Sequence, residues 1–389
     1  MLRGGIPPEV ADEILDHVKD DLPTLLSCCR ASKGLCARVQ PLLYKRLDFV
    51  YQADQLHTPC SLSRSSAFLL DTLYTRPELA RLCTDLRLSW RRKLSTDLVR
   101  LRTEPTAETI RELFECLPNV LRFELAIDTK GVSCSTPLEQ SVIDTLRAWT
   151  GWLELRAFAV PYLSDALMHF VMGRPELVDL RCDTAMPTCA LPAGLVPPFH
   201  LKRLEIASTL DTTLFRIGTS TSYDTLTRLT VPFLFDVAAE LAPFRNLRHL
   251  CLEFRTYGWN SLERCHQKLD ELKAFFKDDS RIETLAFSHA RGHPRSNRIR
   301  TVRSALPRNL KTLILHPWRM YSKDAIKCVK VGMRQHLWPM SLKKLILTPA
   351  SVNGPWTDEE VQQVRDKCLE HSIAEVEMIP WRAVGEYDE

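Results

Sequence analysis

The sequence predicts an α/β solenoid, a curved parallel sheet with outer helices that is preceded by a small three-helix module. Three observations predict it. A short apolar motif recurs along most of the chain, amphipathic segments separate its copies, and the first fifty residues carry a purely helical pattern. At 389 residues the chain is long enough for two domains. We place the helical module at residues 1–47 and the solenoid at residues 48–389.

The recurring motif is apolar-x-x-apolar-x-apolar. It occurs eleven times, and its copies begin at Cys83, Val120, Leu155, Leu177, Leu201, Leu226, Leu247, Ile282, Leu310, Leu342 and Ile373. A twelfth copy, Tyr44-Leu47-Phe49, lies at the junction with the helical module. The copies begin 21 to 37 residues apart, which fits one strand and one return segment. Because alternate side chains of a strand share a face, each copy has an apolar face that only stacked neighbours can bury.

The segments between the motifs carry helical signals. Residues 103–117, 164–171 and 269–276 have apolar side chains at spacings of three and four. Residues 357–360, Thr-Asp-Glu-Glu, match a capping box that begins another helix. Alternation of strand and helix over a long chain predicts a parallel sheet with helices outside it.

The first fifty residues contain three helical stripes. They are formed by Val10, Ile14 and Val18, by Leu22, Leu25, Leu26 and Cys29, and by Leu35, Val39, Leu42 and Leu43. Pro7 and Pro8 begin the first helix, and Ser32 can cap the third. Three short helices form only a marginal core. We therefore expect contact with a partner, or with the domain that follows, to stabilise the module.

Composition excludes several classes of function. The formal charge of +4 is small for this length, so we expect no nucleic-acid partner. No apolar run is long enough for a membrane helix, and the N-terminus lacks a signal-peptide core, so we expect no membrane partner. The 13 cysteines include no C-x-x-C pair and are mostly set among apolar residues. We expect a cytoplasmic or nuclear protein without disulfides or structural zinc.

Catalytic motifs are also missing. The sequence has no G-x-S-x-G, Walker loop, dinucleotide-binding glycine pattern or H-E-x-x-H. His289 and His293 have the spacing of a metal pair but no Cys or Glu support. We expect no enzyme, no catalytic or metal-binding residues and no cofactor. A hydrolase or transferase on an α/β scaffold is the alternative from a different class.

The chain resembles a known family. Ile6-Pro7-Pro8-Glu9-Val10, followed by Ile14, resembles the opening of an F-box, residues 25–33 its middle and residues 41–47 its close. Leu35 stands where the family usually has Trp. The repeat takes the leucine-rich form Asn-Leu-x-x-Leu-x-Leu at residues 246–252 and 309–315. Nearly the whole chain therefore resembles fungal F-box proteins with irregular leucine-rich repeats.

The resemblance implies an adaptor of a ubiquitin ligase. The F-box would dock on Skp1, which links it to a cullin-RING complex, and the repeats would hold a protein substrate. The candidate Skp1 contacts are Ile6, Pro7, Pro8, Val10, Ile14, Leu26 and Leu43. The apolar members of this set can instead fill the small helical core. The alternative function is a repeat-based interaction scaffold without ligase coupling, in which the helices only cap the solenoid.

The surface for the substrate is expected on the strand face opposite the core. Residues between the motif's apolar positions point there, and those of the late repeats form an apolar patch unless a C-terminal segment covers it. Aromatic and basic residues also follow several strands. The candidates are Trp90, Arg181, Tyr257, Ala286, Ile314, Trp318, Arg319 and Ile346. The basic stretch from Arg291 to Arg308 can bind an acidic segment, direct nuclear import or form a solvated loop.

Overall fold

The computed structural model describes most of the predicted elements. The described residues are 7–19, 21–52, 61–91, 107–128, 140–163, 165–185, 196–206, 215–216, 219–232, 240–254, 271–272, 275–276, 281–289, 306–315, 322–334, 338–348, 350–351 and 354–379. They fall into two compact units. Unit 1 comprises Met1–Pro161 and Asp165–Leu177, and unit 2 comprises Tyr162–Ser164 and Val178–Glu389.

Unit 1 begins with three helices, α1 (Pro8–His17), α2 (Leu22–Ala31) and α3 (Lys33–Lys45). The Asp21 carboxylate accepts a hydrogen bond from the Thr24 amide and caps α2. The Ser32 hydroxyl caps α3 by accepting from the Leu35 amide at 3.1 Å, as predicted. The predicted three-helix module is thus confirmed as a local structure.

The strands of unit 1 follow α3 without a break. They are β1 (Arg46–Gln52), β2 (Ser61–Leu62), β3 (Asp85–Arg91), β4 (Arg122–Asp128) and β5 (Ala157–Leu163). Strands β1, β3, β4 and β5 are parallel and adjacent in that order, and β2 pairs antiparallel with the end of β1. The register aligns Leu47, Leu86, Phe123 and Phe158, all buried, in one row. Each row of the repeat therefore becomes a continuous line of core side chains.

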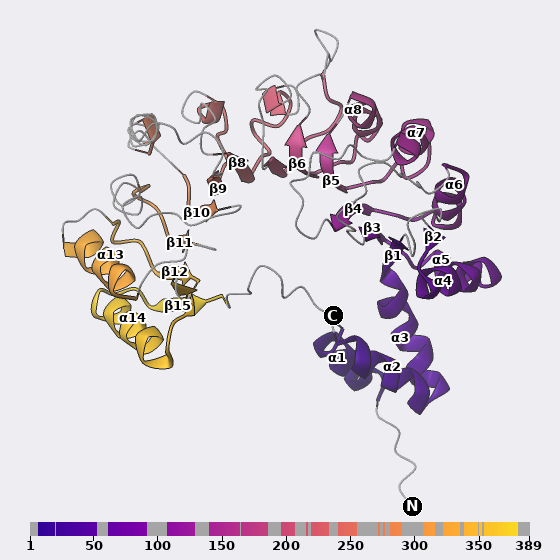
Figure 1. Ribbon diagram of the computed structural model, residues 1–389, viewed down its shortest axis with the longest axis horizontal. Helices are drawn as coiled ribbons and strands as arrows, with labels where there is room; N and C mark the ends of the chain where they lie inside the picture. Colours follow the sequence, from indigo (N-terminus) through magenta and orange to yellow (C-terminus); the bar gives the residue numbers. More distant parts are fainter. Residues whose placement is uncertain are drawn as a thin grey trace, which may run out of the picture. The chain divides into compact units, whose positions relative to one another are not determined.

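Helices α4 (Arg64–Thr75), α5 (Pro77–Ala80), α6 (Ala107–Cys116), α7 (Gln140–Ala148) and α8 (Asp165–Met172) complete unit 1. Figure 1 shows α4, α6 and α7 along one side of the strands. An aromatic cluster fills the layer between them, with the Phe114 and Trp152 rings 4.5 Å apart and the Phe123 and Phe158 rings 5.8 Å apart. The Arg174 guanidinium closes this layer by donating to the carbonyl oxygens of Trp149 and Gly173.

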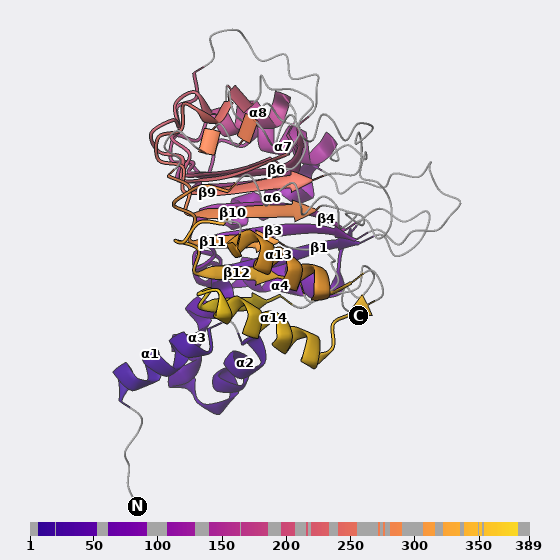
Figure 2. The same cartoon turned by 90° about the vertical axis from the view of Figure 1, so that its left-hand side faces the viewer.

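Unit 2 continues the same architecture. Its parallel strands, adjacent in chain order, are β6 (Asp179–Ala185), β7 (Arg203–Ile206), β8 (Arg228–Pro232), β9 (His249–Phe254), β10 (Thr284–His289), β11 (Thr312–Leu315), β12 (Lys344–Leu347) and β15 (Glu375–Met378). Figure 2 shows β9 to β12 stacked one on another. Helices α13 (Ser322–Arg334) and α14 (Asp358–Glu370) pack together, and β13 (Ala350–Ser351) pairs with β14 (Gly354–Pro355) in a small hairpin.

The fold-class prediction is confirmed. Every copy of the motif, including the twelfth at the junction, forms a strand that begins two residues after its first apolar position. The expected helices at 164–171 and 357–360 appear as α8 and α14, and α14 has the complete capping box between Thr357 and Glu360. The fold is therefore a solenoid of stacked parallel strands with helices between them, preceded by α1–α3.

Candidate interaction surfaces

The helical module has its own small core. Leu15, Leu25 and Val39 are buried, one from each helix, and Val18 and Leu42 pack against them. The Arg38 guanidinium on α3 lies 2.5 Å from the Asp12 carboxylate on α1, which ties the first helix to the third. The core is thus complete without the remaining apolar side chains of α1 and α2.

Those remaining side chains are exposed. Val10 and Ile14, one turn apart on α1, are 44% and 47% exposed. Leu22 and Leu26, one turn apart on α2, are 55% and 42% exposed. We call these four residues the exposed apolar set. Large apolar side chains that a domain leaves uncovered in groups are typical of protein-binding surfaces.

The predicted Skp1 contacts separate into four groups. Val10, Ile14 and Leu26 are exposed, whereas Leu43 is half-buried and packs against the module's core. Pro7 is exposed just before α1, and Pro8 is the first residue of that helix. Ile6 lies outside the described residues. Leu22, which the sequence analysis did not select, has the same exposed character as Leu26.

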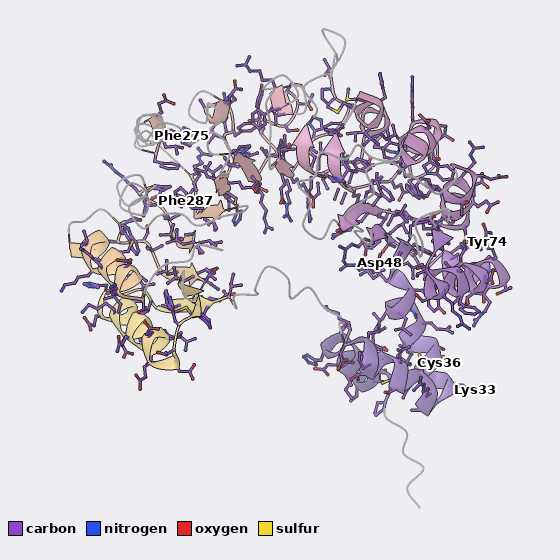
Figure 3. The ribbon with its side chains drawn as sticks, viewed as in Figure 1. Lys33, Cys36, Asp48, Tyr74, Phe275 and Phe287 are labelled. Carbon is purple, nitrogen blue, oxygen red and sulfur yellow. The ribbon has the colours of Figure 1, made fainter. Side chains whose placement is uncertain are left out.

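The thiols of Cys29 on α2 and Cys36 on α3 are in contact. All three cysteines of the module are free and half-buried, and Cys28 and Cys29 pack against its core. The pKa of Cys29 is raised because burial disfavours the thiolate and because its thiol contacts that of Cys36, which Figure 3 labels. The cysteines of the second helix therefore serve as small apolar residues.

The strand face of unit 1 carries balanced charge. Arg87 lies 3.3 Å from Glu124 on the next strand, and Arg122 lies 3.4 Å from Asp85. The Ser89 hydroxyl donates to the Asp48 carboxylate at 2.8 Å. Figure 3 shows Asp48 and the α4 residue Tyr74 on opposite sides of this unit. Because Arg87 and Arg122 each face a carboxylate on a neighbouring strand, these two cations are already neutralised within the unit. Trp90 belongs to β3, and its side chain lies outside the described part of the chain.

The strand face of unit 2 carries an ion pair on β6 and an apolar row on β9 to β12. On β6, Arg181 forms a two-bond ion pair with Asp179, so this predicted substrate contact is already engaged within the chain. Further along, an apolar row is aligned by the strand register; it consists of Cys251, Ala286, Ile314 and Ile346. All four are half-buried. Tyr257, Trp318 and Arg319 lie outside the described residues, as does most of the basic stretch from Arg291 to Arg308.

A second feature of unit 2 was missed by the sequence analysis. Basic residues gather at the N-terminal ends of β7, β8, β9, β11 and β12, whereas β10 carries Glu283 and Thr284 there; we call the basic residues the basic strip: Lys202, Arg203, Arg228, Arg248, Lys311, Lys343 and Lys344. They occupy the two positions between the first and second apolar residues of the motif. The signal was present in the sequence as Leu-Lys-Arg-Leu, Leu-Thr-Arg-Leu, Leu-Arg-His-Leu, Leu-Lys-Thr-Leu and Leu-Lys-Lys-Leu.

The surroundings of His249 and Cys251 on this surface shift the pKa of each side chain. Burial lowers the pKa of His249, and the neighbouring Arg228 lowers it further. Burial also raises the pKa of Cys251 to about 12. At neutral pH His249 is therefore uncharged, and Cys251 is a thiol that belongs to the apolar row rather than a nucleophile.

Other kinds of site lack support in the described part of the chain. No three His, Cys, Asp or Glu side chains there are grouped closely enough to hold a metal ion. None of the described helices has the length and apolar character needed to cross a bilayer. No disulfide joins the described cysteines.

No family model and no curated protein matches this chain. Its function is therefore inferred from its own residues.

Proposed function

We propose that the chain is a substrate-recognition adaptor of a Skp1-cullin-F-box ubiquitin ligase. In this proposal α1–α3 are an F-box that docks on Skp1, and the repeats are leucine-rich repeats that hold a protein substrate. The observation that carries the proposal is the exposed apolar set on α1 and α2. The resemblance of residues 5–47 to an F-box supplies the identity of the partner.

The exposed apolar set is unexplained by folding alone. Full burial of one Val, Leu or Ile side chain stabilises by about 1.5–3 kcal/mol. Each of the four is roughly half exposed, so a partner that covered them would gain about 1 kcal/mol at each. Each gain is below the roughly 2 kcal/mol of a residue that dominates an interface, so the four side chains would act together.

The scaffold alternative accounts for α3 better than for α1 and α2. Helix α3 runs directly into β1 and contacts β1 and α5, so it covers the start of the repeat sheet. If the helices only cap the solenoid, α3 and the small core that supports this helix are sufficient. It gives no reason for Val10, Ile14, Leu22 and Leu26 to be apolar. We therefore favour the adaptor.

Binding of purified Skp1 to the full chain tests the proposal. We expect a stable complex with the intact chain and at least tenfold weaker binding for Ile14→Asp and for Leu26→Asp, because each substitution places a charge in the apolar contact. Phe68→Asp is the matched control, since Phe68 is 59% exposed on α4, outside the module. Circular dichroism establishes that each variant is folded. Failure of the folded intact chain to bind Skp1 refutes the adaptor and leaves the scaffold.

A further inference from the structure

The basic strip is a rigid row of cations. In the repeats of β7 to β11, the residue at the first of the two motif positions has a carbonyl oxygen that accepts two amides from the next repeat. The Lys202 carbonyl, for example, accepts from Thr227 and Arg228, both at 3.0 Å, and the Lys311 carbonyl accepts from Lys343 and Lys344 at 2.9 and 3.0 Å. This backbone ladder holds successive side chains at the spacing of neighbouring strands, about 4.8 Å.

Much of the charge of the strip is not neutralised within the described part of the chain. Three of the seven members are paired: Arg203 with Glu205 at 3.0 Å, Lys311 with Glu283 at 3.1 Å, and Lys344 with Glu377 at 2.9 Å. Four other members are exposed and have no described carboxylate within ion-pair distance: Lys202, Arg228, Arg248 and Lys343. A row of like charges held this closely carries a repulsive cost that an acidic ligand would relieve.

The apolar row, on β9 to β12, shares strands β9, β11 and β12 with the basic strip. Ile346 is two residues from Lys344 on β12, and Cys251 is three residues from Arg248 at the start of β9. The register places the row's members, Cys251, Ala286, Ile314 and Ile346, on four neighbouring strands. Members of the basic strip therefore precede the apolar row by two or three residues along each shared strand, roughly 7–10 Å at about 3.3 Å per residue.

We propose that this surface binds an acidic amphipathic helix of a partner protein, which on the function proposed above is the substrate. A helix lying across the strands presents one side chain per turn of about 5.4 Å, close to the strand spacing of about 4.8 Å. Its apolar stripe covers the apolar row, and carboxylates on one flank face the basic strip. A nucleic acid fits less well, because it offers no apolar stripe to cover the apolar row.

A synthetic probe tests this inference on the full chain. The probe is a fluorescent, lactam-stapled helix about four turns long, with leucines along one face and glutamates along one flank. The first control peptide has the same composition with the leucines distributed around the helix. The second carries lysines in place of the glutamates. We expect saturable binding of the probe, followed by fluorescence anisotropy, and at least tenfold weaker binding of both controls.

Variants of the chain locate the contact. Arg228→Glu and Lys343→Glu should each weaken probe binding about fivefold and strengthen binding of the lysine-flanked peptide. Ile314→Asp should weaken binding of both peptides at least tenfold. Lys327→Glu, an exposed charge on α13, is the matched control and should leave binding unchanged.

Equal binding of probe and permuted peptide overturns the inference, as does tighter binding of a single-stranded oligonucleotide that competes with the probe. Skp1 binding by the intact chain is measured in parallel, so absence of Skp1 binding with probe binding intact refutes only the ligase adaptor.

Discussion

Replacing Gly332 with alanine should destabilise unit 2, although glycine-to-alanine changes in helices usually stabilise. Gly332 lies in the last turn of α13, and its carbonyl accepts from the Trp338 amide at 3.0 Å. A Cβ atom at this position would lie 2.6 Å from the Trp338 Cε2 and Nε1 atoms and 2.7 Å from Cδ1. Carbon atoms in contact are normally about 3.5–4.0 Å apart, so one group must move by about 1 Å.

The size of the effect follows from two opposing terms. Alanine in place of glycine gains up to about 1 kcal/mol of helix propensity. Overpacking a filled core costs about 1–3 kcal/mol, and the Trp338 ring, only 4% exposed, has little room to move. We expect a net loss of about 1–2 kcal/mol in the free energy of unfolding. In a Trp338→Leu background the overlap disappears, so the same substitution should become neutral or stabilising by up to about 1 kcal/mol.

Urea unfolding followed by far-UV circular dichroism measures both effects. Gly34→Ala is the matched control, because its Cβ would meet only the Ser32 hydroxyl, at 4.0 Å, and α3 should gain slightly. A Gly332→Ala variant as stable as the parent would refute the packing described for α13 and Trp338. So would an identical destabilisation in the Trp338→Leu background.

Three further predictions concern Thr357 and Glu360 at the start of α14 and the thiol of Cys251. Thr357→Ala removes the hydroxyl that accepts from the Glu360 amide at 3.2 Å and should cost about 1 kcal/mol in urea unfolding, whereas Thr357→Ser should cost little. Hydrogen bonds from the Ser322 hydroxyl and the Thr357 backbone amide lower the pKa of Glu360 in the folded state below 4.5. Its contribution to stability is therefore full above pH 4.5 and lost as the pH falls through the lower folded value, and Glu360→Gln should flatten this part of the pH profile. Iodoacetamide at pH 8 should leave Cys251 unmodified in the native chain, because burial raises its pKa to about 12; rapid native labelling, detected by mass spectrometry, would contradict its placement.

The strands could be predicted from the sequence because their signal is local. A strand two residues after the first apolar position follows from alternation within six residues, and the parallel order follows because no single copy can bury its own face. The capping box at Thr357 is equally local. Helix α13 was not predicted, although Ala325, Cys328 and Val329 are buried at spacings of three and four residues, a signal that is equally local.

The candidate surfaces were only partly predictable. Val10, Ile14 and Val18 form one stripe in the sequence, yet the helix buries Leu15 and exposes Val10 and Ile14. Spacing identifies the apolar faces of a helix, but only the packing of three helices decides which face is covered. Arg181 was selected for its position on a strand, and its ion pair with Asp179 depends on side-chain geometry that spacing does not encode.

Hydrogen exchange of the full chain with and without purified Skp1 tests the central claim most directly. The account predicts that Skp1 slows exchange of backbone amides in α1 (Pro8–His17) and α2 (Leu22–Ala31), the helices that carry the exposed apolar set, and leaves β9 to β12 unchanged. Protection confined to the repeats, or no change in exchange at saturating Skp1, would contradict it.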